Sequence, residues 1–115
     1  SLSQVKGGRV RALAVTTPKR TKLAPELPTI AESGLPGFDI STWFGIFVPA
    51  GTPRPVVDRL HAEFTKALAA PEVREKMLGL GAEPVGSTPE EFAAFVKAEA
   101  AKYAKLVKAS GAKVD

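Results

Sequence analysis

The chain has 115 residues, of which 44% are hydrophobic and 24% are charged, and its formal net charge is +4. These proportions are ordinary for one globular domain and exclude intrinsic disorder. Cysteine is absent, which excludes disulfides, thiolate metal sites and thiol nucleophiles. No apolar run approaches the roughly 20 residues of a membrane helix. Residues 1–8 also lack the apolar core of a signal peptide, an absence that concerns this chain only.

Positive charge is concentrated near the N-terminal end. The first 22 residues carry six basic and no acidic side chains, whereas the other 93 carry 10 basic and 12 acidic ones. Such a segment can attract phosphate backbones or small anions, but it is more often a solvated surface beside a strand. It contains no interleaved aromatic residues and no nucleic-acid-binding signature, so nucleic-acid binding is the weaker alternative.

Residues 9–15 (RVRALAV) predict the first strand. Their near-continuous apolar run is typical of a strand that is covered on both faces. Thr16, Thr17 and Pro18 end the run, because proline cannot donate to a ladder and disfavours a helical residue before it. The polar residues 19–24 then form a connection.

A short helix is predicted within residues 28–34. Thr29 would be its N-cap, Glu32 would complete a capping box, and Gly34 would end it. Residues 35–37 (LPG) predict a turn, because proline followed by glycine is a turn signature.

Residues 43–48 (WFGIFV) are the strongest strand candidate in the chain. Gly45 inside this strand indicates a bulge, or the close approach of another backbone or of a ligand. Residues 82–85 predict a brief edge strand.

Three helices are predicted after this strand. The first begins at Thr52 and Pro53, because proline is favoured at the first helical position. Residues 71–80 predict a second, short helix that Gly81 ends. Residues 88–91 (TPEE) form a complete capping box and open a third helix of about 20 residues before Gly111.

The predicted fold class is therefore α/β: a strand, a long connection, a strand and three C-terminal helices. Two or three strands cannot easily cover the apolar faces of three helices. The predicted strands are too few for the predicted helices, which predicts that a part of the fold is missing.

The residues give little support to an enzyme. His61 is the only histidine, and it lies within a predicted helix beside the apolar face, where a structural or solvent-exposed position is the favoured interpretation. No nucleophile motif, paired-histidine motif, carboxylate cluster or phosphate-binding glycine loop is present. We therefore predict no catalytic residues, no metal site and no cofactor.

Ligand binding by backbone and small polar groups is the remaining possibility. Thr16 and Thr17 follow the end of a strand, where ligands commonly bind in open α/β sheets. Trp43 and Phe44 offer aromatic surface beside Gly45, which would let a ligand approach the main chain. The alternative, a core tryptophan and a packing glycine, is favoured by the residue types alone.

Three segments resemble one family of transport receptors: GGRVRALAVTTPKR (residues 7–20), LPTIAESGLPGFDISTWFGIFVPAGTP (residues 27–53) and GAEPVGSTPEEF (residues 81–92). Together they are similar to the C-terminal part of TctC-like, Bug-type receptors, the extracytoplasmic solute-binding proteins of tripartite tricarboxylate transporters. The similarity covers nearly the whole chain in the right order.

The resemblance implies part of a two-lobe, periplasmic-binding-protein-like fold that closes on a small carboxylate. Residues 1–26 would be the end of the second lobe with a strand near the hinge. Residues 27–42 would cross between the lobes, and residues 43–115 would be the C-terminal part of the first lobe. The chain would correspond to roughly the last third of such a receptor, which accounts for the shortage of strands relative to helices.

The resemblance also implies a periplasmic location and three partners: a small carboxylate, the membrane components of the transporter and the rest of the receptor chain. Thr16, Thr17, Trp43, Phe44 and Gly45 would line the cleft wall, whereas the main carboxylate-binding residues would lie in the preceding part of the chain. The first alternative is an isolated α/β fragment that forms homo-oligomers and has no ligand affinity. A basic nucleic-acid-binding domain is the second.

Overall fold

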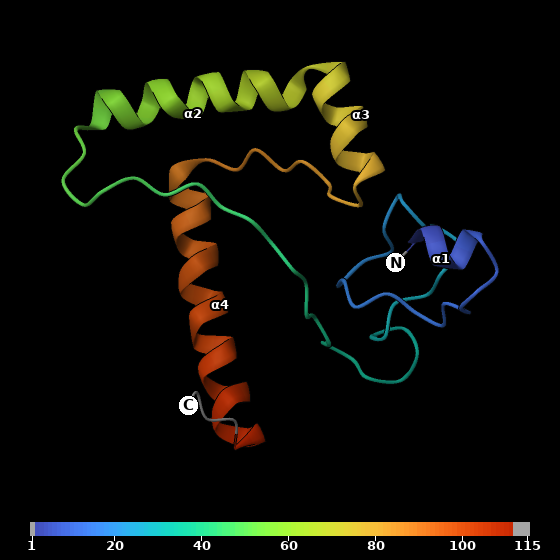
Figure 1. Cartoon of the computed structure of the whole chain (residues 1–115). Coiled ribbons are helices and arrows are strands. Elements are labelled where there is room, and N and C mark those ends of the chain that lie inside the picture. Colours follow the sequence, from blue (N-terminus) through green and yellow to red (C-terminus); the bar gives the residue numbers. More distant parts are fainter. Residues whose placement is uncertain (1, 112–115) are drawn as a thin grey trace. The chain divides into compact units, whose positions relative to one another are not determined.

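The structure is a computed structural model, and it describes residues 2–111. Within these residues, four helices follow one another (Figure 1): α1 (Leu2–Lys6), α2 (Arg54–Ala69), α3 (Pro71–Gly79) and α4 (Pro89–Ser110). The residues form two compact units, one of Ser1–Ala50 with Glu75–Glu83 and the other of Gly51–Arg74 with Pro84–Asp115.

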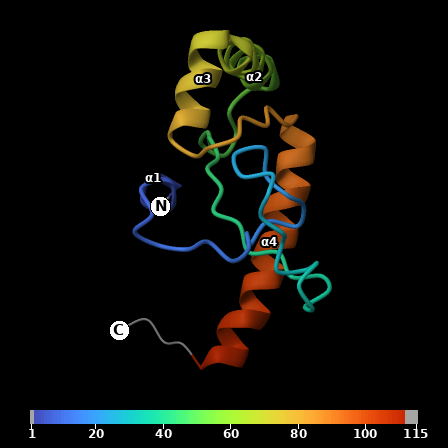
Figure 2. The ribbon, with the colours of Figure 1, turned by 90° about the vertical axis from the view of Figure 1, so that its right-hand side faces the viewer.

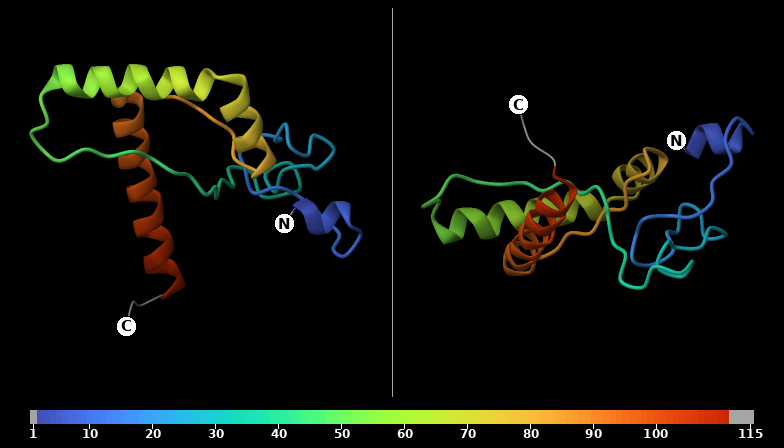
Figure 3. Two further views of the ribbon diagram at one scale, coloured as in Figure 1. Left: turned by 45° about the horizontal axis from the view of Figure 1, so that its top comes forward. Right: turned by 90° about the horizontal axis from the view of Figure 1, so that it is seen from below.

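The three predicted C-terminal helices are confirmed. The helix α2 begins at Arg54, slightly later than predicted, and its N-cap is Pro53, without a side-chain cap hydrogen bond. The break at Ala70 separates α2 from α3, as Pro71 predicts. The helix α4 begins close to α2 and then runs away from it in one straight piece (Figure 3).

The predicted capping box of α4 is formed. The Thr88 hydroxyl accepts a hydrogen bond from the Glu91 amide at 3.2 Å, and the Glu91 carboxylate accepts one from the Thr88 amide at 2.9 Å. Gly111 ends the helix in the left-handed conformation, with φ of +67°. Local sequence therefore determines both ends of α4.

Acid should weaken the start of α4. The backbone amide of Thr88, followed by its hydroxyl, lowers the pKa of Glu91 from the ordinary value of 4.5. A carboxylate with a lowered pKa in the folded state stabilises that state fully above its ordinary pKa, and the contribution is lost as the pH falls through the lowered value. Helix content should therefore fall on acidification below pH 4.5.

Circular dichroism of Glu91→Gln measures this effect. The variant keeps an acceptor for the Thr88 amide but cannot titrate, so its helix content should depend less on pH in this range. Glu63→Gln, on an exposed position of α2, is the matched control and should titrate like the parent chain. Equal acid curves for the parent chain and for Glu91→Gln would contradict the prediction.

The strand layout predicted by the sequence is not formed. Within residues 2–111, the β-structure consists of one isolated parallel bridge between Val15 and Thr29. Residues 43–48 and 82–85 belong to no sheet. A strand needs a neighbour for its ladder of hydrogen bonds, and the described residues supply that neighbour only at Val15.

Two turns outside the helices match the sequence. Thr29 and Glu32 form the predicted capping box, although residues 30–34 make a turn and not a helix. At the Pro-Gly turn, Gly37 has φ of +80° and the Phe38 amide donates to the Leu35 carbonyl at 3.1 Å. The helix α1 was not predicted from the sequence.

Very little of the described surface is buried. Ala24 is the one buried hydrophobic residue within residues 3–111, and Thr29 and Glu99 are the buried polar residues. Many large apolar side chains of α2, α4 and residues 44–48 are exposed.

Candidate functional site

The backbone of Val15 and Thr16 is held on two sides by other segments. The Val15 amide donates to the Pro28 carbonyl at 2.9 Å, and the Ile30 amide donates to the Val15 carbonyl at 2.9 Å. The Ile40 amide donates to the Thr16 carbonyl at 3.1 Å. Because successive residues of an extended chain direct their peptide groups to opposite sides, the hydrogen bonds of Val15 and Thr16 reach two different neighbouring segments, as those of a central strand do. Figure 2 shows this part of the chain as the blue to teal loops that follow α1. Residues 15–17 are called the Thr16 edge below.

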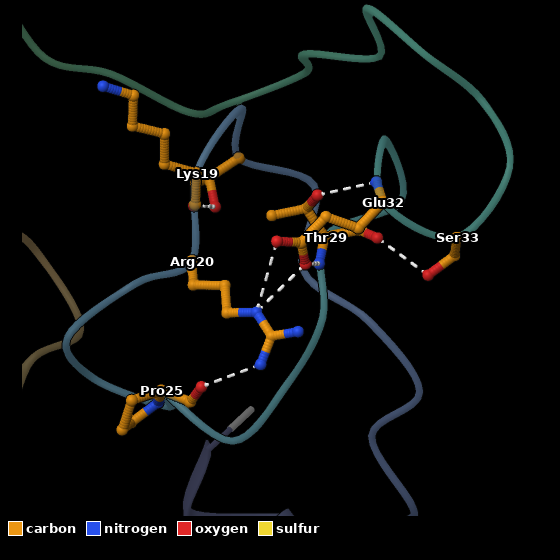
Figure 4. A network of polar contacts seen from close by, with 7 residues as sticks. Lys19, Arg20, Pro25, Thr29, Glu32 and Ser33 are labelled. Atoms are coloured by element: carbon orange, nitrogen blue, oxygen red, sulfur yellow. Dashed lines mark hydrogen bonds and ion pairs between the residues drawn. The ribbon is translucent and has the colours of Figure 1, made fainter.

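Thr29 holds one neighbour of this edge in place. Its side chain is 1% exposed, and its hydroxyl accepts a hydrogen bond from the Glu32 amide at 3.0 Å (Figure 4). The Thr29 amide donates to the Glu32 carboxylate at 2.9 Å, and the Ser33 hydroxyl donates to the Thr29 carbonyl at 2.8 Å. These bonds fix the turn whose first residues pair with Val15.

An ion pair joins this turn to the residues that follow the Thr16 edge. The Arg20 Nε lies 3.0 Å from Glu32 Oε2, and its Nη1 donates to the Pro25 carbonyl at 3.5 Å (Figure 4). The Thr29 amide and the Arg20 guanidinium lower the pKa of Glu32. Glu32 therefore stays ionised at neutral pH and links both ends of the 20–32 loop.

We expect the Arg20→Ala substitution to have a small effect on stability. Both side chains of the ion pair are about half exposed, and ion pairs of this kind contribute little free energy. The midpoint of urea unfolding should stay within experimental error, while amide exchange of Thr29 should remain slow because its bond to Glu32 is kept. Arg20→Lys, which keeps the charge, is the matched control. A large loss of stability in Arg20→Ala alone would contradict this expectation.

The five sequence-predicted site residues all belong to the same compact unit. Thr16 is exposed, and Thr17 is half-buried with its hydroxyl donating to the Lys19 carbonyl at 2.7 Å. Trp43 is half-buried, Gly45 is exposed, and Phe44 is 89% exposed. The bond from Ile40 to Thr16 ties the segment that leads to Trp43 to the Thr16 edge.

Two features of this region were missed by the sequence interpretation. One is the pairing of Arg20 with Glu32, since their separation of 12 residues follows no helical or strand spacing. The other is Glu83, whose carboxylate accepts hydrogen bonds from the Thr21 hydroxyl and the Lys22 amide. A contact across about 60 residues depends on the tertiary fold and leaves no local signal.

His61 has the structural surroundings that the sequence favoured. Its Nε2 lies 3.1 Å from the Ser87 carbonyl and 3.3 Å from the Thr65 hydroxyl, next to the cap of α4. Across the part of the chain that the structure describes, no three His, Asp or Glu side chains gather as a metal site would require. The helices in this same part are too short or too polar to span a bilayer.

Comparison with known protein families identifies the chain. The profile of the "Tripartite tricarboxylate transporter family receptor", TctC, matches residues 1–112. The chain belongs to the TctC receptor family. This confirms the resemblance carried by the motifs at residues 7–20, 27–53 and 81–92.

Curated TctC relatives match nearly the whole chain. A UPF0065 protein encoded in the tcbD-tcbE intergenic region of Pseudomonas sp. (strain P51) is 52% identical over 100 residues, which cover 86% of this chain and 30% of the relative. BugT of Bordetella pertussis is 34% identical over 113 residues, covering 98% of this chain and 35% of BugT. The chain thus spans about a third of the length of these relatives.

Solved structures share the fold of this chain. BugD, a periplasmic binding protein, aligns with a TM-score of 0.76 and 42% identity over 96% of this chain and 38% of BugD. R. palustris Rpa4515, solved with adipate, aligns with a TM-score of 0.76 and 38% identity over 95% of this chain and 36% of that protein. The chain therefore has a periplasmic-binding-protein fold, which confirms that part of the predicted fold class.

Proposed function

We propose that this chain is part of a periplasmic receptor that captures a small carboxylate for a tripartite tricarboxylate transporter. The TctC profile match carries the proposal, because it covers nearly the whole chain. The adipate in the structure of Rpa4515 supports a dicarboxylate as the ligand class. The partners would be the membrane components of the transporter and the remainder of a receptor chain. The role is binding and not catalysis.

Within such a receptor, we assign the segments as the sequence analysis does. Residues 1–26 would end the second lobe, residues 27–42 would cross between the lobes, and residues 43–115 would complete the first lobe. The predicted strands at residues 9–15 and 43–48 would then be paired in full. The hydrogen bonds on both sides of Val15 and Thr16 support the first of these strands.

We assign the cleft wall to Thr16 and Thr17 on one segment and to Trp43, Phe44 and Gly45 on the other. Three observations favour this assignment. Thr16 is exposed, the backbone of Val15 forms hydrogen bonds with Pro28 and Ile30, and the bond from Ile40 to Thr16 ties the segment before Trp43 to the Thr16 edge. Hydroxyl groups and backbone amides at the end of a strand can donate hydrogen bonds to a bound carboxylate without a charged partner.

A chimeric receptor tests this function. BugD in which the matched 38% is replaced by this chain would supply the rest of a two-lobe receptor. Adipate should raise the melting temperature of the chimera, and Thr16→Val and Trp43→Ala should weaken the binding measured by calorimetry. Thr65→Val, on an exposed position of α2, is the control and should leave the binding unchanged. A folded chimera that responds to no dicarboxylate would disprove the proposal.

One observation supports the alternative that the chain is an isolated, self-associating fragment: many of its large apolar side chains are exposed. It concerns the chain by itself, for which we expect weak or no response to adipate. A monomeric isolated chain that binds a dicarboxylate at micromolar affinity would contradict this alternative.

A further inference from the structure

The segment after α3 reaches back to the loop that follows the Thr16 edge. Glu83 Oε1 accepts a hydrogen bond from the Thr21 hydroxyl at 2.5 Å and another from the Lys22 amide at 3.2 Å. The partners are 62 and 61 positions apart along the sequence, and all three residues belong to the same compact unit. The tertiary fold of that unit therefore joins Glu83 to a stretch of chain that begins shortly after the candidate cleft wall.

Local sequence determines where Glu83 lies. Gly81 has φ of +83°, its amide donates to the Leu78 carbonyl at 2.9 Å, and the Ala82 amide donates to the Met77 carbonyl at 2.9 Å. These two bonds form a Schellman motif, which ends a helix with a defined turn. Glu83 follows the motif directly, so a defined turn, and not a flexible linker, places its carboxylate beside the loop.

Thr21 is the centre of the turn that Glu83 contacts. Its half-buried hydroxyl donates to Glu83 and accepts from the Leu23 amide at 3.2 Å, and its carbonyl accepts from the Ala24 amide at 3.3 Å. A hydroxyl has one proton to donate, and here the Glu83 carboxylate accepts it while an oxygen lone pair binds the Leu23 amide. Glu83 thus orients the group that closes the turn.

The turn at residues 21–24 is connected to the Thr16 edge on both sides. Before the turn, the Thr17 hydroxyl donates to the Lys19 carbonyl at 2.7 Å. After the turn, the Pro28 carbonyl accepts from the Val15 amide at 2.9 Å. A loop whose turn is fixed keeps less conformational freedom, which favours the ordered form of the segments that it joins.

We propose that Glu83 is a positioning residue for the ligand site. It orients the turn at residues 21–24 and thereby holds Thr16 and Thr17 in the conformation that binds a carboxylate, without touching the ligand itself. The inference rests on the proposed function, which gives Thr16 and Thr17 their role. Apparent affinity falls with the fraction of molecules whose site has the competent conformation. Loss of the Glu83 contact should therefore weaken binding although every group that contacts the ligand is kept.

Substitutions in the BugD chimera test this role by calorimetry. Glu83→Ala and Thr21→Val should each raise the Kd for adipate about tenfold, the factor that corresponds to one hydrogen bond to a charged group. The double variant should stay close to Thr21→Val, because both substitutions remove the same contact. Thr21→Ser keeps the hydroxyl and should bind like the parent chimera. Glu75→Ala, on an exposed position of α3, is the matched control and should leave the Kd unchanged.

Amide exchange without ligand gives a second readout. The Val15 amide should exchange about tenfold faster in Glu83→Ala and in Thr21→Val than in the parent chimera, because a loosened turn frees the segment that pairs with it. The Glu91 amide, in the cap of α4, should exchange as in the parent chimera. A purely structural role of Glu83 would lower the melting temperature and leave both the Kd of the folded chimera and the Val15 exchange unchanged.

The outcomes separate this inference from the proposed function. A folded parent chimera that binds no adipate overturns the proposed function, and the Val15 exchange then decides whether Glu83 holds the Thr16 edge. An unchanged Kd in folded variants of a chimera that binds adipate overturns the inference, whatever their melting temperature. A weaker Kd with unchanged Val15 exchange also overturns it, because the effect then does not pass through the Thr16 edge. If Glu83→Ala does not fold, the comparison of Thr21→Val with Thr21→Ser decides, and equal weakening by the two overturns the inference.

Discussion

The isolated chain is expected to self-associate in solution, with a mass above 12.1 kDa by size-exclusion chromatography and light scattering. The physical reason is the exposed apolar surface. Phe44 and Ile46, together with large side chains of α2 and α4, are exposed to solvent. Burial of each such side chain stabilises an assembly by about 1.5–3 kcal/mol, and exposed apolar patches of this size are unusual in monomers.

The dependence of the measured mass on protein concentration gives a sharper test of self-association. The double substitution Phe44→Ser with Ile46→Ser should weaken association at least about tenfold, since it removes two large apolar side chains from the exposed face. Lys97→Ser is the matched control and should leave the mass distribution unchanged. A monodisperse monomer over the whole concentration range would refute the prediction.

The second large effect is expected at Thr29. Thr29→Val keeps the shape of a side chain that is 1% exposed but removes the acceptor of the Glu32 amide. Loss of a capping hydroxyl at a buried position should cost about 1–2 kcal/mol of stability. Arg20→Ala removes an exposed ion pair in the same network and should cost less, so burial decides the ranking of the two substitutions.

Amide hydrogen exchange shows which backbone hydrogen bonds the Thr29→Val substitution weakens. The amides of Val15 and Ile30 form the two bonds of the parallel bridge, and their exchange should be faster in the variant. Thr16→Val is the matched control, because it makes the same chemical change on an exposed side chain. Equal effects of the two substitutions on exchange and on unfolding would show that the Thr29 hydroxyl does not hold this turn.

Local signals in the sequence predicted the local structure well. The capping boxes at Thr29 and Thr88, the turn at Gly37 and the end of α4 at Gly111 each depend on residues within a few positions of one another. These features need no distant partner, so the sequence alone was sufficient for them.

The strands were predicted less well, because a strand forms only where a neighbouring segment pairs with it. Residues 43–48 have the composition of a buried strand, but the structure assigns them to no helix, turn or sheet. A strand is completed only by a neighbour, and the described residues provide one only around Val15, where Pro28, Ile30 and Ile40 supply the hydrogen bonds. Composition predicts the conformation of such a segment, whereas its pairing depends on residues far away in the sequence.

The sequence by itself determined the family, through three motifs, and the positions of the three C-terminal helices. Only the tertiary structure decided that Arg20 pairs with Glu32, that Glu83 binds the backbone of Lys22, and that Ile40 ties its segment to the Thr16 edge. The motifs and the helices depend on short-range geometry that is characteristic of each residue type. The three tertiary contacts depend on closing loops of 12 to 61 residues, which no local sequence pattern predicts.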